Sequence, residues 1–169
     1  MPFFYNQPLT RVDKFTLFIY TILTLALIGF YLFNKDDSGV WLMGYAVLTQ
    51  LFSFFFLYVA LRNAAFFLVV YGFGLIHLIM YFLMVDHFAI QTVNFSYLAT
   101  LRNTIVLLTF FQVLRWLSIK IQNREFVVPT KGGDTDFIEN KKTSFADYVF
   151  LFIYIGAWGG LSYLSITYP

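Results

Sequence analysis

Cysteine is absent from the chain, which excludes disulfides, thiolate metal sites, iron–sulfur clusters and thiol catalysis. Charge is also scarce. Charged residues make up 12% of the sequence, about half of the usual share, and a net charge of +2 is too small to indicate binding of nucleic acid or acidic substrates. A soluble domain of 169 residues keeps much of its surface in water, and so few charged side chains cannot cover it. The sequence therefore predicts contact with lipid.

What the chain has instead is apolar residues, which make up 60% of it, with 22% aromatic residues. Four uncharged runs have the length of a membrane span, since about 20 helical residues cross roughly 30 Å of hydrocarbon. Backbone groups in lipid must satisfy one another, so we expect helices. The N-terminal segment lacks a signal-peptide cleavage pattern, so we expect the first helix to remain as an anchor. The four expected helices cover residues 15–33, 40–61, 64–85 and 148–168.

A fifth span is expected within residues 88–121, although Arg102 lies in the middle of this segment. We predict a helix over about residues 96–119, preceded by a short segment at the membrane interface. The alternative is a re-entrant element over residues 88–101 followed by a shorter span. The predicted fold is an all-α integral membrane protein, a five-transmembrane-helix bundle that forms a single domain over residues 1–169.

The distribution of positive charge predicts the orientation, because lysine and arginine concentrate on the cytoplasmic side of membrane proteins. With the N-terminus in the cytoplasm or the equivalent organellar matrix, nine of the 11 basic residues fall on that side and two on the other. The nine are Arg11, Lys14, Arg62, Arg115, Lys120, Arg124, Lys131, Lys141 and Lys142, and the two are Lys35 and Arg102. We therefore predict a cytoplasmic N-terminus and a C-terminus on the opposite side.

The only sizeable polar segment is the expected cytoplasmic loop, residues 122–147. It is too short to form an independent catalytic domain, but it is a candidate for docking against a partner. Residues 144–147, Ser-Phe-Ala-Asp, form a capping-box pattern that precedes the last helix. Asp134, Asp136 and Glu139 fit no calcium-loop spacing, and we interpret them as a solvated acidic turn.

Polar side chains within the expected spans are candidates for a ligand-binding site, because they are costly in hydrocarbon. The candidates, in the middle or outer half of the second to fourth helices, are Gln50, Ser53, His77, Arg102 and Asn103. For His77 the functional alternatives are a haem ligand, a proton relay and a donor to a quinone. The structural alternative is one hydrogen bond to a neighbouring helix. A haem between helices needs two axial ligands, and the second histidine, His87, lies just past the third helix.

Arg102 has two interpretations. Its long side chain either extends outward to the lipid headgroups or points inward and pairs. All nine acidic residues lie in tails, in loops or at the ends of spans. An inward-pointing Arg102 would therefore need a partner from another subunit, a lipid headgroup or a quinone carbonyl.

Glycines mark two candidate packing surfaces. Gly156 and Gly160 form a GxxxG pair on one face of the last helix, and such a pair lets another backbone approach closely. The approaching helix belongs either to the same bundle or to another subunit. Gly72 and Gly74 in the third helix are the candidate internal receiver.

No pattern in the sequence indicates catalysis. No Ser-His-Asp arrangement or carboxylate pair is available within the spans, and no phosphate-binding loop or metal-ligand spacing occurs. We therefore predict a non-catalytic integral membrane subunit of a larger complex, without a cofactor, in a bacterial or organellar inner membrane. Its expected partners are lipid and other membrane subunits or copies of itself. The alternative is a transporter-like protein that binds a lipid, a quinone or a small solute at the polar residues of helices two to four.

Overall fold

The computed structural model describes residues 3–33, 38–88, 92–130, 134–136 and 138–167. Within these ranges the chain forms five α-helices, one short 3-10 helix and no β-strand. The elements in chain order are α1 (Arg11–Phe33), α2 (Ser38–Phe55), η1 (Ala60–Arg62), α3 (Ala64–Phe88), α4 (Thr92–Gln122) and α5 (Phe145–Thr167). The prediction of an all-α, five-helix membrane bundle is confirmed.

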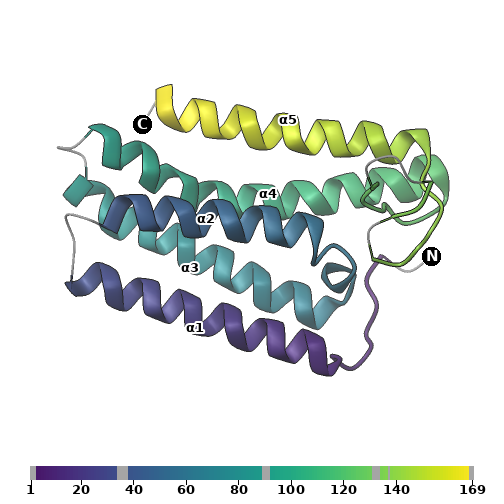
Figure 1. Cartoon of the computed structure of the whole chain (residues 1–169), viewed down its shortest axis with the longest axis horizontal. Coiled ribbons are helices and arrows are strands. Elements are labelled where there is room, and N and C mark those ends of the chain that lie inside the picture. Colours follow the sequence, from purple (N-terminus) through teal and green to yellow (C-terminus); the bar gives the residue numbers. More distant parts are fainter. Residues whose placement is uncertain (1–2, 34–37, 89–91, 131–133, 137, 168–169) are drawn as a thin grey trace.

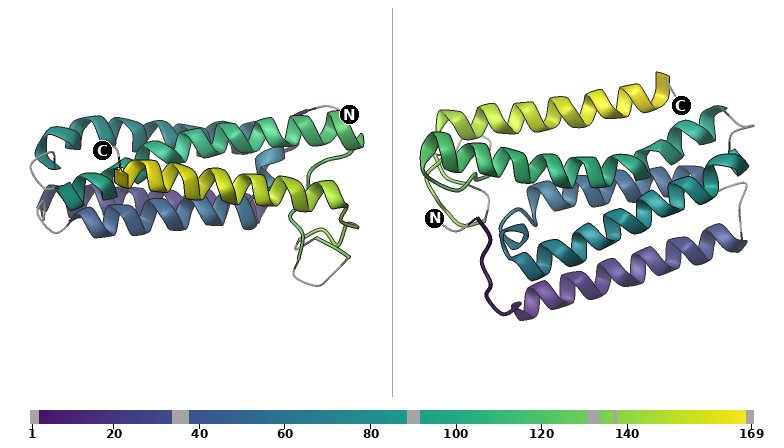
Figure 2. Two further views of the ribbon diagram at one scale, coloured as in Figure 1. Left: turned by 90° about the horizontal axis from the view of Figure 1, so that it is seen from above. Right: turned by 180° about the vertical axis from the view of Figure 1, so that it is seen from behind.

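The helices run side by side, and α4 is the centre of the bundle (Figure 1, Figure 2). It packs against α2, α3 and α5, whereas α1 lies at one edge against α2 and α3, and α5 lies at the opposite edge. The N- and C-terminal segments lie at opposite ends of the bundle, as predicted. The end that carries the N-terminal segment is called the basic end, because Arg62, Arg115 and Arg124 lie there. Lys35 and Lys131 lie outside the described residues.

The lengths and surfaces of the helices suit a bilayer. Four helices are long and apolar enough to cross it, and the apolar part of α2, Gly39–Phe55, is shorter. At about 1.5 Å per residue, the 18 residues of α2 still extend about 27 Å, close to the thickness of the hydrocarbon. Only 17% of the spans in α1 and in α5 is buried within the protein. Their exposed apolar side chains, among them Phe18 and Phe152, therefore lie on the outside of the bundle, where lipid or other transmembrane helices can contact them.

Three helices begin at side-chain caps. Thr10 and Asp13 form a capping box in which Thr10 Oγ1 accepts from the Asp13 N–H and the Asp13 carboxylate accepts from the Thr10 N–H. Ser144 and Asp147 form the same box, which confirms the predicted pattern. The Asn63 side chain accepts from the first turn of α3. These boxes explain why α1 and α5 begin four and three residues earlier than predicted.

The second helix ends at Phe55, so the prediction that it continues to Leu61 is wrong. The chain turns after Phe55 and forms η1. Hydrogen bonds to residues of the later loop and of α4 stabilise this turn. The Tyr58 hydroxyl donates to the Asp136 carboxylate, and the Gln112 side chain of α4 donates to the Leu61 carbonyl at 3.2 Å. Tertiary contacts therefore override the local helical tendency of this apolar run.

The fourth helix is a single element from Thr92 to Gln122, which is longer than the predicted 96–119. The re-entrant alternative over residues 88–101 is wrong where the structure describes it, because one continuous helix runs from Thr92 onward. The position of the segment before residue 96 at the membrane interface stays a prediction. Residues 89–91 lie outside the described residues. Asn123 ends the helix in the left-handed conformation, with φ of 54°, a common helix-ending geometry.

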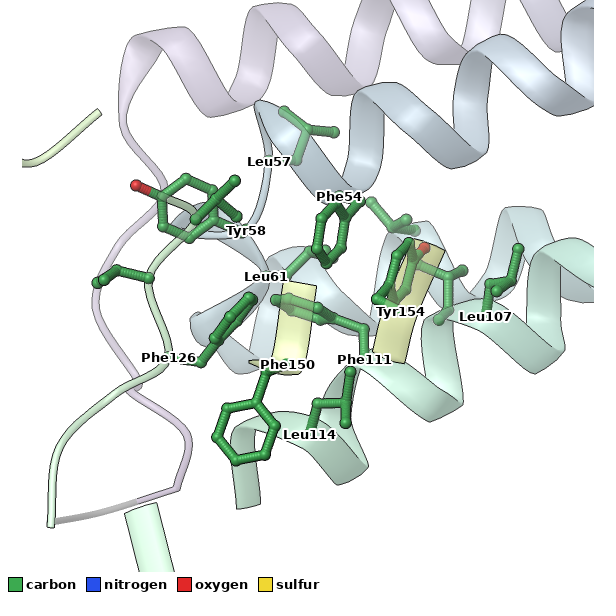
Figure 3. Close-up of a cluster of buried hydrophobic side chains, with 14 of the residues drawn as sticks. Phe54, Leu57, Tyr58, Leu61, Leu107, Phe111, Leu114, Phe126, Phe150 and Tyr154 are labelled. Atoms are coloured by element: carbon green, nitrogen blue, oxygen red, sulfur yellow. The ribbon is translucent and has the colours of Figure 1, made fainter. Parts of the chain in front are cut away.

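Aromatic side chains form the core near the basic end (Figure 3). Phe54 of α2 stacks on Tyr154 of α5, with ring centroids 3.7 Å apart and an interplanar angle of 9°. Phe126, which follows α4, inserts edge-on against Phe111 and Phe150. Phe126 is fully buried. The segment that follows α4 is therefore part of the hydrophobic core.

Candidate functional site

A series of hydrogen bonds links all five helices near the middle of the bundle. Its members, here called the polar chain, are Trp158 of α5, Gln50 of α2, Thr104 of α4, His77 of α3, Tyr45 of α2 and Thr24 of α1. The separations between successive side-chain atoms are 3.0, 3.0, 3.3, 3.2 and 2.5 Å. Each helix therefore supplies at least one polar group that a neighbouring helix satisfies.

The direction of the polar chain can be assigned from its first member. An indole N–H only donates, so Trp158 donates to the side-chain oxygen of Gln50. The amide nitrogen of Gln50 has two hydrogens, and it donates to Thr104 Oγ1 at 3.0 Å and to the Thr100 carbonyl at 2.8 Å. Thr104 accepts from Gln50, which leaves its own hydroxyl hydrogen free for His77.

The other end of the polar chain gives the same direction. The Thr24 hydroxyl donates to the Tyr20 carbonyl at 2.8 Å, so Thr24 accepts from the Tyr45 hydroxyl. Tyr45 has then used its hydrogen and accepts from His77 Nε2, while His77 Nδ1 accepts from Thr104. This pattern corresponds to a neutral imidazole with its proton on Nε2. Both ring nitrogens of the fully buried His77 are occupied.

This arrangement bears on the chemistry predicted for His77. A haem iron needs a free ring nitrogen, and neither is free here. A proton relay needs an exchangeable group at both ends, whereas the polar chain begins at an indole and ends at a backbone carbonyl. The structural alternative, hydrogen bonding between helices, accounts for the geometry and extends to two neighbouring helices rather than one.

The five candidate residues are only partly brought together. Gln50 and His77 both bond to Thr104, so they belong to one site. Ser53 and Asn103 are buried as well. The Arg102 guanidinium lies over the Tyr81 ring, 5.5 Å from its centroid, in a cation–π contact within this chain.

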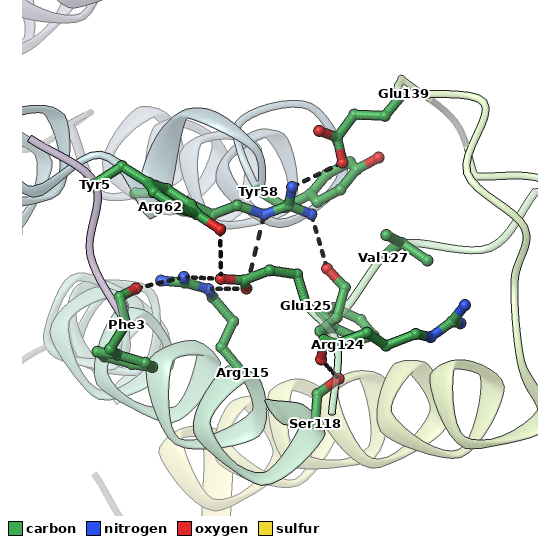
Figure 4. A network of polar contacts seen from close by, with 12 residues as sticks. Phe3, Tyr5, Tyr58, Arg62, Arg115, Ser118, Arg124, Glu125, Val127 and Glu139 are labelled. Carbon is green, nitrogen blue, oxygen red and sulfur yellow. Dashed lines mark hydrogen bonds and ion pairs between the residues drawn. The ribbon is translucent and has the colours of Figure 1, made fainter. Parts of the chain in front are cut away.

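A second polar network, which the sequence reasoning missed, is buried at the basic end (Figure 4). Arg115 is completely buried and binds Glu125 through two hydrogen bonds of 3.1 and 3.0 Å. Its remaining donors reach the Gln112 side chain at 2.6 Å and the Phe3 carbonyl at 2.8 Å. The N-terminal segment, α4 and the segment after α4 therefore meet at one guanidinium.

Arg62 completes this network. It donates to Glu139 at 2.7 Å and to the Phe126 carbonyl at 3.0 Å, and its Nε lies 3.9 Å from Glu125. Arg62, Arg115, Glu125 and Glu139 are here called the ion cluster. Two positive and two negative charges compensate one another, which lowers the cost of burying them. The sequence places these residues in loops and at span ends, but no local pattern indicates that they are buried.

Asp136 contradicts the prediction of a solvated acidic turn, because it is buried and organises the loop before α5. Its carboxylate accepts from the Tyr58 hydroxyl and from the Glu139 and Lys141 backbone N–H groups. Burial raises the pKa of Asp136, but these hydrogen bonds outweigh it, and the pKa lies below its ordinary value of 3.8. Burial, together with the neighbouring Asp136 carboxylate, raises the pKa of Tyr58.

Part of the loop between α4 and α5 docks on the chain's own bundle. Phe126, Val127 and Val128 are buried. Arg124 pairs with Asp147, the carboxylate that also caps α5. These described residues of the loop therefore close the basic end of the bundle.

The glycines of α3 differ from each other. A Cβ atom at Gly74 would lie 3.3 Å from Leu108 Cδ1 and 3.6 Å from Ile105 Cα, so Gly74 lets α3 approach α4 closely. A Cβ atom at Gly72 would meet no atom within 4 Å. The interpretation of these two glycines as a receiver for α5 is wrong, because α5 packs on α4 and the close approach at Gly74 is to α4.

The GxxxG pair of α5 faces away from the bundle. Phe150 and Tyr154 are buried on the inner face of the helix, and Trp158 follows them one turn later with its indole bonded to α2. Gly156 and Gly160 are exposed on the other face, and a Cβ atom at either would meet no atom within 4 Å. Of the two packing alternatives, packing within this bundle is therefore excluded for the described residues.

The apolar helices define an integral, multi-pass helical membrane protein. In the parts of the chain that the structure describes, no group of three or more histidine, aspartate or glutamate side chains is placed to hold a metal ion. No family model, curated protein or solved structure matches the chain.

Proposed function

We propose that the chain is a non-catalytic integral membrane subunit that packs against other transmembrane helices through the outer face of α5. The observation that carries the proposal is the open pair Gly156 and Gly160 on that face. Association of helices in lipid depends on close packing, and glycines four residues apart allow it. Gly74 shows the same device already in use between α3 and α4.

The state of the buried polar groups supports a non-catalytic role. Polar side chains within a membrane usually mark ligand or ion sites. Here Gln50 and His77 are occupied by hydrogen bonds to other helices, and the ion cluster compensates its own charges. The alternative function is binding of a lipid, quinone or solute at Gln50, Ser53, His77, Arg102 and Asn103. It has less support, because a ligand would have to break the bonds of Gln50 and His77.

The proposal also covers the partners of the chain and the membrane in which it resides, and experiments in cells test both. The partners are other membrane subunits or further copies of the chain, and the membrane is a bacterial or organellar inner membrane. No cofactor is needed for such a role. The predicted cytoplasmic position of the basic end rests on the distribution of lysine and arginine.

The test is purification of the tagged full chain from its native membrane in mild detergent, at native abundance. The wild-type chain is expected to retain stoichiometric partner chains or a second copy. The Gly156→Leu/Gly160→Leu variant is expected to lose at least nine-tenths of them, because two leucines block close approach. Gly29→Leu is the matched control, since this glycine of α1 also has open space around it and lacks a glycine four residues away.

Two results would contradict the proposal. One is a wild-type chain that elutes as a lone monomer with no co-purifying protein. The other is a double variant that keeps its partners as well as the Gly29→Leu control does. Helix content measured by circular dichroism shows whether each variant is folded.

A further inference from the structure

A pocket with a volume of about 500 Å³ lies at the basic end, between the N-terminal segment and the last turns of α4. Phe3 forms one wall, and the other consists of Trp116, Ile119, Lys120 and Asn123. The lining combines apolar side chains with one ammonium group and one amide, and none of its described residues is acidic. The pocket therefore suits a ligand that carries a negative charge together with apolar groups.

The wall formed by Phe3 is fixed in place by the ion cluster (Figure 4). Arg115 Nη2 donates to the Phe3 carbonyl at 2.8 Å, and the guanidinium lies 4.8 Å from the centroid of the Phe3 ring. Two residues later, the Tyr5 N–H donates to the Arg62 carbonyl and the Tyr5 carbonyl accepts from the Ala64 N–H, both at 3.0 Å. These bonds hold the N-terminal segment against the bundle, so the pocket is formed before a ligand binds.

Lys120 supplies the positive charge of the pocket, and it is exposed. The arginines of the basic end differ from it, because Arg62, Arg115 and Arg124 each pair with a carboxylate. Lys120 forms no ion pair with any residue that the structure describes. Its charge is therefore available to an anion from outside the chain, and a lysine ammonium binds phosphate as a point charge.

An exposed stripe of α4 leads from the pocket into the hydrocarbon. Its members, three or four residues apart on one face of the helix, are Val106, Thr109, Val113, Trp116 and Lys120. At 1.5 Å per residue the stripe extends about 21 Å, more than the roughly 15 Å that one leaflet contributes to the hydrocarbon. Tryptophan and lysine are typical of the headgroup level. A phospholipid with its phosphate at Lys120 can therefore place an acyl chain along this stripe.

An anionic phospholipid fits these features better than a soluble anion or an acidic protein segment. A phosphate ion has no apolar part to contact Phe3, Trp116 and the stripe below them. A protein segment would have to enter the headgroup layer to reach Lys120. The basic end is predicted to lie on the cytoplasmic side, where anionic lipids attract lysine side chains near the membrane surface.

We propose that the pocket between the N-terminal segment and the end of α4 binds the headgroup of one anionic phospholipid, with its phosphate at Lys120 and an acyl chain along the exposed stripe of α4. The site uses none of the residues on the outer face of α5. Its test therefore stands or falls independently of the proposed subunit role.

The experiment compares two lipids at the site. Because the chain has no cysteine, Val113→Cys introduces a single thiol on the stripe, two helical turns from Lys120, to which a bimane fluorophore is attached. The labelled full chain is reconstituted in phosphatidylcholine vesicles, and quenching by brominated phosphatidylglycerol is compared with quenching by brominated phosphatidylcholine. The anionic lipid is expected to bind about fivefold more strongly, the contribution of one lysine near the headgroups.

Lys120→Gln, in the same labelled chain, is expected to reduce this ratio to about one. Lys14→Gln is the matched control and is expected to keep the ratio, because Lys14 is exposed at the same end of the bundle but lies outside the pocket. Equal binding of the two lipids by the parent chain would overturn the proposal. So would an unchanged ratio in Lys120→Gln, or an equal loss in Lys14→Gln, which would indicate attraction by the general surface charge.

Two further measurements separate the lipid from other anions. Millimolar inorganic phosphate is expected to leave the quenching by phosphatidylglycerol unchanged, and displacement of the lipid would mean that the pocket binds a free anion. With benzophenone in place of bimane, illumination in the native membrane is expected to give an adduct with lipid. An adduct with a polypeptide would show instead that a protein covers the stripe, and the proposal would be wrong.

Discussion

The basic end of the bundle and its α1 edge are held together in opposite ways. At the basic end, the ion cluster, the aromatic core and the docked loop join α2, α4, α5 and the N-terminal segment. Along α1, three buried residues provide the attachment, one of them the hydrogen-bonded Thr24, and a groove runs beside them. The buried charged residues of the ion cluster thus stabilise one end of the bundle, whereas the outer surfaces of α1 and α5 carry exposed apolar residues that can contact lipid and neighbouring proteins.

The largest effect is expected from Arg115→Met. The substitution removes one partner of a buried pair and leaves the Glu125 carboxylate under-compensated, which costs about 3–5 kcal/mol of unfolding free energy. Thermal unfolding of the detergent-solubilised chain measures it. Lys120→Met is the control, since Lys120 is exposed on the same helix. A shift no larger than that of the control would show that the basic end does not depend on the ion cluster.

A smaller loss of unfolding free energy is expected from His77→Phe, which breaks the polar chain at its centre. Tyr45 and Thr104 each lose a partner, and hydrogen bonds between membrane helices contribute about 0.6–1.7 kcal/mol each. The expected loss is therefore roughly 1–3 kcal/mol. Leu75→Phe, at an exposed position of α3, is the control. Equal stability of the two variants would mean that the polar chain does not hold the helices together.

Acid should loosen the loop before it loosens the helices. The folded-state pKa of Asp136 lies below its ordinary value of 3.8, so the stabilisation is fully present above about pH 4 and is lost as the pH falls through the folded-state pKa. Limited proteolysis of the loop as a function of pH measures this. Asp136→Asn should open the loop already at neutral pH, at a cost of about 1–2 kcal/mol. Cleavage of the wild-type loop that does not change down to pH 2 would contradict the account.

The smallest effect is expected at the lipid-facing surface of α1. Phe18 is 60% exposed and belongs to neither the ion cluster nor the polar chain. Phe18→Leu should change the unfolding free energy by less than about 0.5 kcal/mol, because exposed substitutions rarely do more. A change comparable to that of His77→Phe would show that α1 is packed more tightly than three buried residues imply.

Much of the fold follows from patterns that lie within single segments of sequence. Hydrophobic length gives the five helices, and an odd number of spans gives termini at opposite ends. The Ser144 and Asp147 pair gives the start of α5. Thr10 and Asp13 form the same kind of capping box, which accounts for the earlier start of α1.

The remaining features depend on residues that are distant in sequence. The stop of α2 at Phe55 depends on Gln112 and Asp136, and no glycine or proline marks it. The candidate site is only partly predictable for the same reason. The positions of Gln50 and His77 along their spans place both at a similar depth in the membrane. Thr104 joins them by hydrogen bonds, but nothing in the surrounding sequence distinguishes it from other threonines in the spans. Arg115 has the pattern of a residue flanking a span, and only the docked loop explains why it is buried.

The most direct test of the central claim, that the outer face of α5 meets another protein, is site-specific photocrosslinking in the native membrane. Phe152→Cys places a thiol on that face one turn before Gly156, and Phe18→Cys places one on the lipid-facing side of α1. With benzophenone attached, the account predicts a protein adduct from the α5 position and only lipid adducts from the α1 position. Lipid adducts alone at both positions would contradict it.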